Sequence, residues 1–237
     1  MRQYAALLER RVQSSTRVRK VQAVTRQTNP IGRSMIEMLG VLAIIGVLSV
    51  GGIAGYSKAM TKWKINKSIE QISLIITNIK TLYAQQKNYN GLNNASAYSL
   101  GIVPDEASTS LWQIDTPFNG YIYIEGWCSD TCIPFIQDRF IIDARELPRE
   151  ACIALATTDW GASSYSGLIA VSATYGTSSA ELYFATDQVP GCSGGTSDNA
   201  VVACPGGSDI PVPMPPEYAA KACNCKENTC SLRWYYQ

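Results

Sequence analysis

The chain has 237 residues, of which 46% are hydrophobic and 16% charged, and its formal net charge is +1. The absence of histidine excludes Ser-His-Asp and Cys-His catalysis, and every metal site that needs an imidazole ligand. The length suffices for one sizeable domain with appendages, and nothing in the charge favours nucleic-acid binding.

The first 32 residues are strongly basic. They carry seven Lys or Arg and one Glu, a net charge of +6, whereas the remainder carries 13 basic and 18 acidic residues, a net charge of −5. A basic head therefore precedes a mildly acidic body. Such an Arg-rich, acid-poor head is also typical of a mitochondrial transit peptide, which is a minority interpretation here.

An apolar segment follows the basic head. Between Ser34 and Ser57 the only charged residue is Glu37, and a helix of this length extends about 36 Å, enough to cross the hydrocarbon core of a bilayer. The run is too long for a secretory signal peptide, and no A-x-A-like site follows it. Basic residues flank both ends, so the orientation depends on the cysteines, which all follow residue 127 and favour an oxidising compartment. We predict a single-pass protein with its N-terminus in the cytoplasm.

Gly32 stands five positions before Glu37, and the apolar run that follows contains AIIG at residues 43–46. On these residues the segment resembles the type IV pilin and pseudopilin family, and its long leader is most like the type IVb branch, such as the toxin-coregulated pilus pilin. The resemblance implies removal of residues 1–32 by a prepilin peptidase that cuts between Gly32 and Arg33. It also implies N-methylation of Arg33 and a role for Glu37 in filament assembly. The first mature residue of the family is usually Phe or Met, and here it is Arg33.

The apolar pattern continues beyond Tyr56 on one face. Steps of three and four residues join Ile65, Ile69, Ile72, Ile76, Ile79 and Tyr83, which is typical of an amphipathic helix. No proline interrupts residues 31–103. We therefore predict that the transmembrane half, residues 33–57, continues without a break into an amphipathic half within residues 58–90. The helix should end near Lys87, before Asn90-Gly91.

Residues 91–237 read as an extracytoplasmic domain of short strands, turns and one helix. The helix is expected within LPREACIALATTDW (147–160), and PFNG (117–120) is a turn. Residues 191–216 are rich in Gly, Ser and Pro and read as a loop. The expected strands are YIYIEGW (121–127), RFIIDA (139–144), GLIAVSA (167–173), ELYFAT (181–186) and CSLRWYYQ (230–237). The predicted fold class is α+β, with an antiparallel sheet laid on the isoleucine stripe.

Eight cysteines favour disulfides over a zinc site, because no second C-x-x-C half is present. They are Cys128, Cys132, Cys152, Cys192, Cys204, Cys223, Cys225 and Cys230. We expect four disulfides, with Cys192–Cys204 closing the loop. The resemblance to type IVb pilins further implies that Cys152, in a short helix, bonds to Cys223, Cys225 or Cys230.

Other candidate sites are weaker. Carboxylate pairs of the kind that glycosidases use occur at Asp143 with Glu146 and at Glu146 with Glu150. Asp198 and Asp209 lack the clustered acidic spacing of a calcium loop. We expect no catalytic residue, no cofactor and no metal. Four tryptophans are candidates for a sugar- or surface-binding face, although burial is the commoner outcome for such residues: Trp112, Trp127, Trp160 and Trp234.

The resemblance implies a prepilin that is held in the bacterial inner membrane and then polymerises into a type IVb-like pilus. The implied partners are related pilin subunits, a prepilin peptidase, inner-membrane assembly machinery and the lipid bilayer. Within the family, the alternatives are a pseudopilin of a type II secretion system, which would place the filament in the periplasm, and a minor tip pilin acting as an adhesin. A membrane-anchored enzyme is the alternative outside it.

Overall fold

The computed structural model describes residues 35–86, 88–107, 112–128, 137–161, 166–175, 194–196, 200–225 and 230–237. The chain forms two compact units, Met1–Gly52 and Ile53–Gln237, and each is considered by itself. The predicted strand ELYFAT, the leader and the cut at Gly32–Arg33 lie outside the described residues.

One helix, α2 (Met35–Tyr83), contains both the apolar run and the isoleucine stripe. Glu37 in its first turn and Lys80 in its last turn suit the helix dipole. The predicted uninterrupted helix is confirmed from Met35, although it ends at Tyr83 rather than near Lys87. Beyond that end, Gly91 adopts the left-handed conformation (φ 80°) that favours glycine.

The isoleucine stripe of α2 covers the sheet, but it is wider and begins later than predicted. Ile72, Ile76, Ile79 and Tyr83 are buried, whereas Ile65 and Ile69 are half-buried. Ile75, which the three-and-four spacing leaves out, is completely buried. Two adjacent positions per turn therefore face the sheet in this part of the helix, which makes the buried face broader than a single line of residues.

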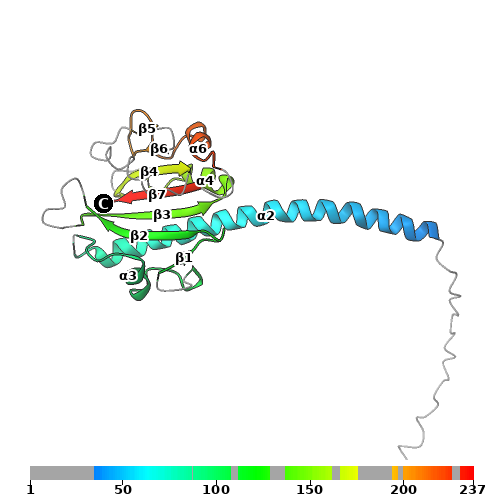
Figure 1. The fold of residues 1–237 in the computed structure, drawn as a ribbon, viewed down its shortest axis with the longest axis horizontal. Coiled ribbons are helices and arrows are strands. Elements are labelled where there is room, and N and C mark those ends of the chain that lie inside the picture. The colour runs from blue at the N-terminus through cyan, green and yellow to red at the C-terminus, as the bar shows by residue number, and fades with distance from the viewer. Residues whose placement is uncertain are drawn as a thin grey trace, which may run out of the picture. The chain divides into compact units, whose positions relative to one another are not determined.

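Within the residues that the structure describes, the sheet has seven antiparallel strands in the order β1-β2-β3-β7-β4-β6-β5. The C-terminal strand β7 lies in the middle, between β3 and β4, and α2 lies against one face (Figure 1). The predicted α+β class is confirmed. The strands are β1 (Ile114–Asp115), β2 (Tyr121–Trp127), β3 (Arg139–Leu147), β4 (Leu168–Tyr175), β5 (Gly195–Thr196), β6 (Ala200–Ala203) and β7 (Cys230–Tyr236).

Each sheet face has its own apolar cluster, because successive side chains of a strand point to opposite faces. Phe140, Ile142 and Trp234 pack with α2 in the main core. On the opposite face Ile141, Tyr235 and Val202 belong to a smaller cluster.

The predicted turn at PFNG joins β1 to β2, and a Cβ at Gly120 would lie 2.1 Å from the Arg145 carbonyl oxygen. Only glycine fits there.

The single predicted helix of the body is present as α4 (Arg149–Ala156), with Ala151 and Leu155 buried. The expectation of one helix was nevertheless wrong, because the body also contains α3 (Asn94–Ser99), α6 (Pro216–Ala222) and a 3-10 turn, η1 (Asp105–Ala107). The loop prediction for residues 191–216 was also wrong in part. That segment contains β5 and β6, and the apolar run AVVA pairs with β4.

The α3 segment covers the edge of β2 beyond its short pairing with β1. Asn93 caps the helix through a capping box with Ser96. The Asn94 side chain bonds to the backbone of β2 as a neighbouring strand would. Its Nδ2 donates to the Ile122 carbonyl (3.0 Å), and its Oδ1 accepts from the Ile124 amide (2.7 Å). These bonds satisfy backbone groups that would otherwise form an unpaired sheet edge.

Candidate functional site

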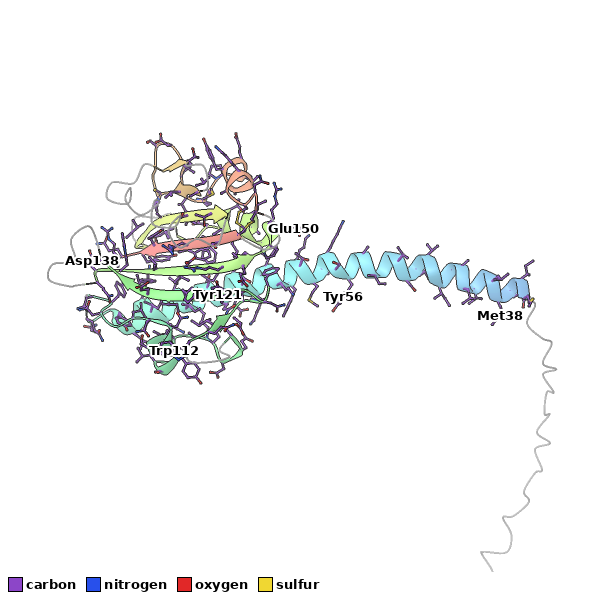
Figure 2. The ribbon with its side chains drawn as sticks, viewed as in Figure 1. Met38, Tyr56, Trp112, Tyr121, Asp138 and Glu150 are labelled. Atoms are coloured by element: carbon purple, nitrogen blue, oxygen red, sulfur yellow. A yellow bond between two sulfur atoms is a disulfide. The ribbon has the colours of Figure 1, made fainter. Side chains whose placement is uncertain are left out.

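The first candidate is the apolar part of α2 that begins at Met35. Its large side chains are exposed within the chain, for example Met35 at 88% and Val47 at 75% (Figure 2). Among the described residues, α2 is the one helix whose length and composition allow it to cross a membrane. A side-chain set this apolar requires either lipid or other protein around it.

Glu37 is exposed in the first turn of this segment. A carboxylate there is favoured by the helix dipole but, inside lipid or a helix bundle, it requires a cation. Gly32 and Arg33, which the resemblance places at the cleavage site, lie outside the described residues. The cleavage, the methylation and the role of Glu37 therefore stay predictions.

The cysteines form a second candidate site, at one end of β7. Cys152 of α4 is bonded to Cys223 at the end of α6, and Cys225 is bonded to Cys230 at the start of β7. The link from Cys152 to the C-terminal cysteines is thus present. The sulfurs of Cys152, Cys223 and Cys230 lie within 4.8 Å of one another, but each is engaged in a disulfide.

Two further cysteines, Cys128 and Cys204, are also disulfide-bonded. Cys132 and Cys192 lie outside the described residues, so the predicted Cys192–Cys204 pair stays a prediction. The described cysteines include none that is free.

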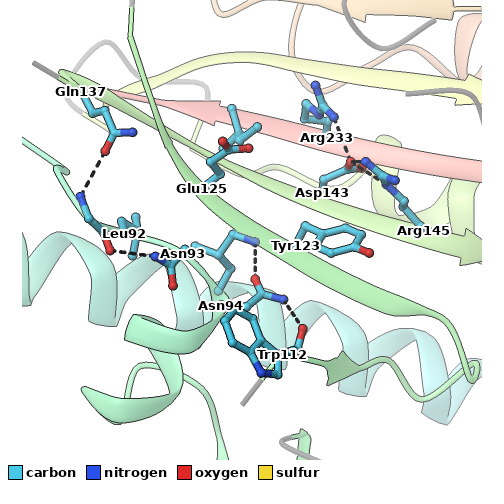
Figure 3. A pocket seen from close by; sticks show the side chains of 13 residues that line it. Leu92, Asn93, Asn94, Trp112, Tyr123, Glu125, Gln137, Asp143, Arg145 and Arg233 are labelled. Atoms are coloured by element: carbon cyan, nitrogen blue, oxygen red, sulfur yellow. Dashed lines mark hydrogen bonds and ion pairs between the residues drawn. The ribbon is translucent and has the colours of Figure 1, made fainter. Parts of the chain in front are cut away.

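A groove of about 470 Å³ opens on the sheet face opposite α2, and we call it the sheet-face groove. Figure 3 shows its side chains, which come from the α3 segment, from β2, β3 and β7, and from the residues just before β1 and β3. Aromatic, amide and charged groups all contribute to its wall. The side chains used below are Trp112, Tyr123, Glu125, Asp143, Arg145 and Arg233.

Asp143 lies at the floor of this groove and is 1% exposed. Arg145 donates to its Oδ2 from Nε and Nη2, both at 2.8 Å, and Arg233, its cross-strand neighbour on β7, donates from Nη2 at 2.9 Å. Burial lowers the pKa of Arg233, but Asp143 and Tyr235 together outweigh it, so that the pKa lies above its ordinary value. Asp143 therefore anchors two cations.

The two predicted carboxylate pairs do not form a catalytic arrangement in the structure. Glu146 lies in the bulge between Ala144 and Leu147 with φ 57°, and it is exposed, as is Glu150. Asp143 itself is bound to arginines. Asp198 lies outside the described residues, and Asp209 is exposed and accepts a bond from Ser208.

The four tryptophans divide between core and surface. Trp160 and Trp234 are buried and pack edge to face at 5.0 Å. Trp127 is half-buried, and Trp112 is 73% exposed at the rim of the sheet-face groove. Burial, the commoner outcome, thus holds for two of them.

Asp143→Ala should lower the free energy of unfolding by about 3 kcal/mol, because it leaves a buried arginine without its counter-ion. Urea denaturation of the detergent-solubilised chain measures the change. Glu150→Ala removes an exposed carboxylate from the same part of the sequence and should change the value by less than about 0.5 kcal/mol. Equal effects of the two substitutions would show that Asp143 contributes no more to the free energy of unfolding than an exposed carboxylate does.

Alkaline pH should destabilise the domain. Burial raises the pKa values of Tyr89, Tyr235 and Tyr236 above the ordinary 10.0, although Arg233 partly offsets this for Tyr235. The folded chain then binds protons more tightly than the unfolded chain, so the stabilisation is complete below pH 10 and is lost as the pH rises further. Burial lowers the pKa of Lys80, which acts in the opposite direction but through one group.

Urea midpoints at pH 9 and pH 11 test this expectation, with mass spectrometry to verify that the disulfides survive. Each tyrosine contributes a slope of at most about 1.4 kcal/mol per pH unit. Tyr235→Phe should reduce the pH dependence. A midpoint that stays constant or rises from pH 9 to pH 11 would contradict the assignment.

The chain is similar in sequence to known proteins. Residues 57–203 match the family model described as Bundlin. The chain is 26% identical over 133 residues to the major structural subunit of bundle-forming pilus of Escherichia coli O127:H6 (strain E2348/69 / EPEC), and equally to that of Escherichia coli O111:H-. Each match covers 56% of this chain and 66% of the relative, just under two thirds of its length.

Among solved structures, the chain is similar to TcpA, a type IV pilin from Vibrio cholerae El Tor biotype. The identity is 17% and the TM-score 0.48, over 74% of this chain and 99% of that chain. The family model, by contrast, matches the sequence itself and spans more than half of it. This chain therefore belongs to the bundlin family.

Proposed function

We propose that the protein is a type IV pilin, a structural subunit that polymerises into a pilus. The observation that carries the proposal is the bundlin match over residues 57–203, together with relatives named as major structural subunits of a pilus. The fold supports it in physical terms. A disulfide-bonded sheet domain is continuous with a long helix whose exposed apolar side chains need a partner once the subunit leaves lipid.

The proposed path begins in the inner membrane, with the N-terminus in the cytoplasm and the cysteine-containing domain outside. A prepilin peptidase cuts between Gly32 and Arg33, Arg33 is N-methylated, and inner-membrane machinery then transfers the subunit to a growing filament. In the filament the apolar part of α2 packs on other subunits. The chain acts by binding copies of itself, and no enzymatic activity is proposed.

The peptidase step gives the sharpest test of this proposal. The chain is expressed with its own or a related prepilin peptidase and, separately, without one, and the membrane-extracted protein is weighed intact. The expected mature mass lacks residues 1–32, allowing for one methyl group. A mature chain that still contains Arg26 would contradict the cleavage.

Filaments supply the second measurement. Antibody against the domain should label the length of purified pili if the chain is a major subunit, and only their tips if it is a minor one. Labelling restricted to the periplasm would favour the pseudopilin alternative. If no filament contains the chain, the proposed function is wrong.

A further inference from the structure

A second groove lies where α2 meets the β1–β2 turn and the start of α4, and we call it the juxtamembrane groove. Its volume is about 680 Å³. Tyr56 and Glu150, two of its lining residues, lie toward the same end of the domain, whereas Asp138 lies at the other end (Figure 2). The side chains that matter here are Tyr56, Met60, Lys64, Phe118, Arg149 and Glu150.

The groove begins where the apolar run of α2 ends. Ile53 and Tyr56 line it and belong to the last turns of that run, and both are mostly exposed. Lys64 is seven residues after Ser57, so its Cα lies about 10 Å further along the helix axis. The headgroup region of a bilayer adds about 5–8 Å on each side of the hydrocarbon core. The Lys64 Cα therefore lies just beyond the headgroups, and because side chains of a helix point toward its N-terminus, the ammonium extends back to the phosphates.

The chemistry of the groove changes from apolar to cationic along the helix. Tyr56, Met60 and Phe118 provide the apolar wall. The Lys64 Nζ lies over the Phe118 ring, 5.7 Å from its centroid, so the ammonium is held at the groove. Its neighbour Lys67 is instead paired with Glu70 at 3.3 Å and with Glu106 at 2.5 Å.

Arg149 supplies the second cation, from the start of α4. One guanidinium nitrogen, Nη1, donates to Asn224 at 3.4 Å, and an arginine has five N–H donors in all. Glu150 is the one carboxylate among the described residues that line the groove, and together these residues carry a net charge of +1. Lys64 and Arg149 come from different elements, which distinguishes this pair from the lysines at residues 58 and 62 on the other side of α2.

We propose that the juxtamembrane groove binds the headgroup of an anionic phospholipid while the subunit is held in the membrane. The phosphate binds between Lys64 and Arg149, and the first acyl methylenes lie against Met60 and Tyr56. The site rests on the membrane-held stage of the proposed function. Lipid fits better than a second subunit because the described lining residues come from one chain and follow directly after the apolar run of α2, with Tyr56 and Met60 preceding Lys64 on the helix.

Native mass spectrometry of the full chain in mild detergent tests the site. Equal amounts of phosphatidylglycerol and phosphatidylcholine are added, and the lipids retained per chain are counted. The wild-type chain should retain one phosphatidylglycerol, with a preference over phosphatidylcholine of about tenfold. Lys64→Gln with Arg149→Gln should abolish the preference. Lys58→Gln with Lys62→Gln removes the same charge from the opposite side of α2 and should leave the preference within about twofold.

Each other outcome overturns the site. Equal retention of both lipids by the wild-type chain excludes selection by the headgroup. Equal loss of the phosphatidylglycerol preference in the two double variants means that basic residues on all sides of α2 attract the lipid, without a defined site. A dimer cross-linked through cysteines introduced at the groove, without retained phosphatidylglycerol, assigns the groove to a second copy. Resistance to alkaline extraction and filament yield are measured in parallel. A chain that inserts and polymerises without lipid preference refutes this site alone, whereas failure to insert or polymerise counts against the proposed function.

Discussion

Replacing Cys152 and Cys223 together with alanine should lower the free energy of unfolding of the domain by about 4 kcal/mol. The bond closes a loop with a sequence separation of 71, whereas Cys225–Cys230 has a separation of 5. Because a cross-link removes more entropy from the unfolded chain when the loop is longer, the same change at Cys225 and Cys230 should cost only about 2 kcal/mol. The two double variants are matched in chemistry and differ in loop length.

The position of Cys152–Cys223 adds to this expectation. Both cysteines are completely buried in the main core, and the bond joins α4 to the end of α6. Urea denaturation of the two double variants, with the remaining disulfides verified by mass, measures the difference. If the variant lacking Cys225–Cys230 is the less stable of the two, chain entropy does not control the contribution of these bonds.

Regular local patterns made the larger elements predictable. The three-and-four spacing of isoleucines identified the second half of α2, and Pro148 with the apolar positions of 151 and 155 identified α4. Strands β2, β3, β4 and β7 were found because apolar, β-branched or aromatic residues alternate or follow one another in each. Each of these signals lies within one short stretch of sequence, so it can be recognised without knowing which distant residues that stretch contacts.

The missed elements depend on contacts across the sequence. Asn94 reads as an ordinary turn residue until β2 lies beside it, 28 positions away. The four residues of β6 are too short and too closely surrounded by Gly, Ser and Pro to be distinguished from loop until β4 pairs with them.

The candidate site was predicted only where a motif marks it. Gly32, Arg33 and Glu37 were singled out because their spacing resembles the type IV pilin pattern, and their roles stay predictions. The resemblance also linked Cys152 to the C-terminal cysteines, and that bond is present. Asp143, by contrast, was noted only as one carboxylate of a weak candidate pair with Glu146, and no catalytic role was expected of it. Its real partners are Arg145, two residues along the strand, and Arg233, 90 positions away. Cross-strand register between β3 and β7 decides this, and no local pattern encodes it.

Glu37→Ala should abolish filament formation while leaving insertion, cleavage and the disulfide-bonded domain intact. Within a low-dielectric helix bundle a carboxylate needs a cation, and breaking such a pair weakens subunit association by about 3 kcal/mol, or roughly a hundredfold. Cleavage after Gly32 would supply that cation as the new α-amino group of Arg33. Uncleaved, the same nitrogen is a neutral amide.

The pairing is expected between subunits rather than within one. A helix extended to residue 33 would separate that residue from Glu37 by about 6 Å along the axis, which disfavours contact between the amine and Glu37 in the same chain. A neighbour shifted along the filament can present its amine to Glu37. The pair then stabilises one register and penalises others, because a shifted neighbour leaves the carboxylate buried without a partner.

Three variants separate charge from shape and position. Glu37→Gln keeps the side-chain size and should fail as Glu37→Ala does. Glu70→Ala removes an exposed carboxylate from the same helix and should leave the yield of sheared pili near that of the wild type. Since the Arg33 guanidinium is a second cation beside the amine, Arg33→Met tests whether the amine alone suffices, and filaments should persist. Normal pilus yield from Glu37→Ala would reduce Glu37 to a carboxylate that only seeks the membrane surface.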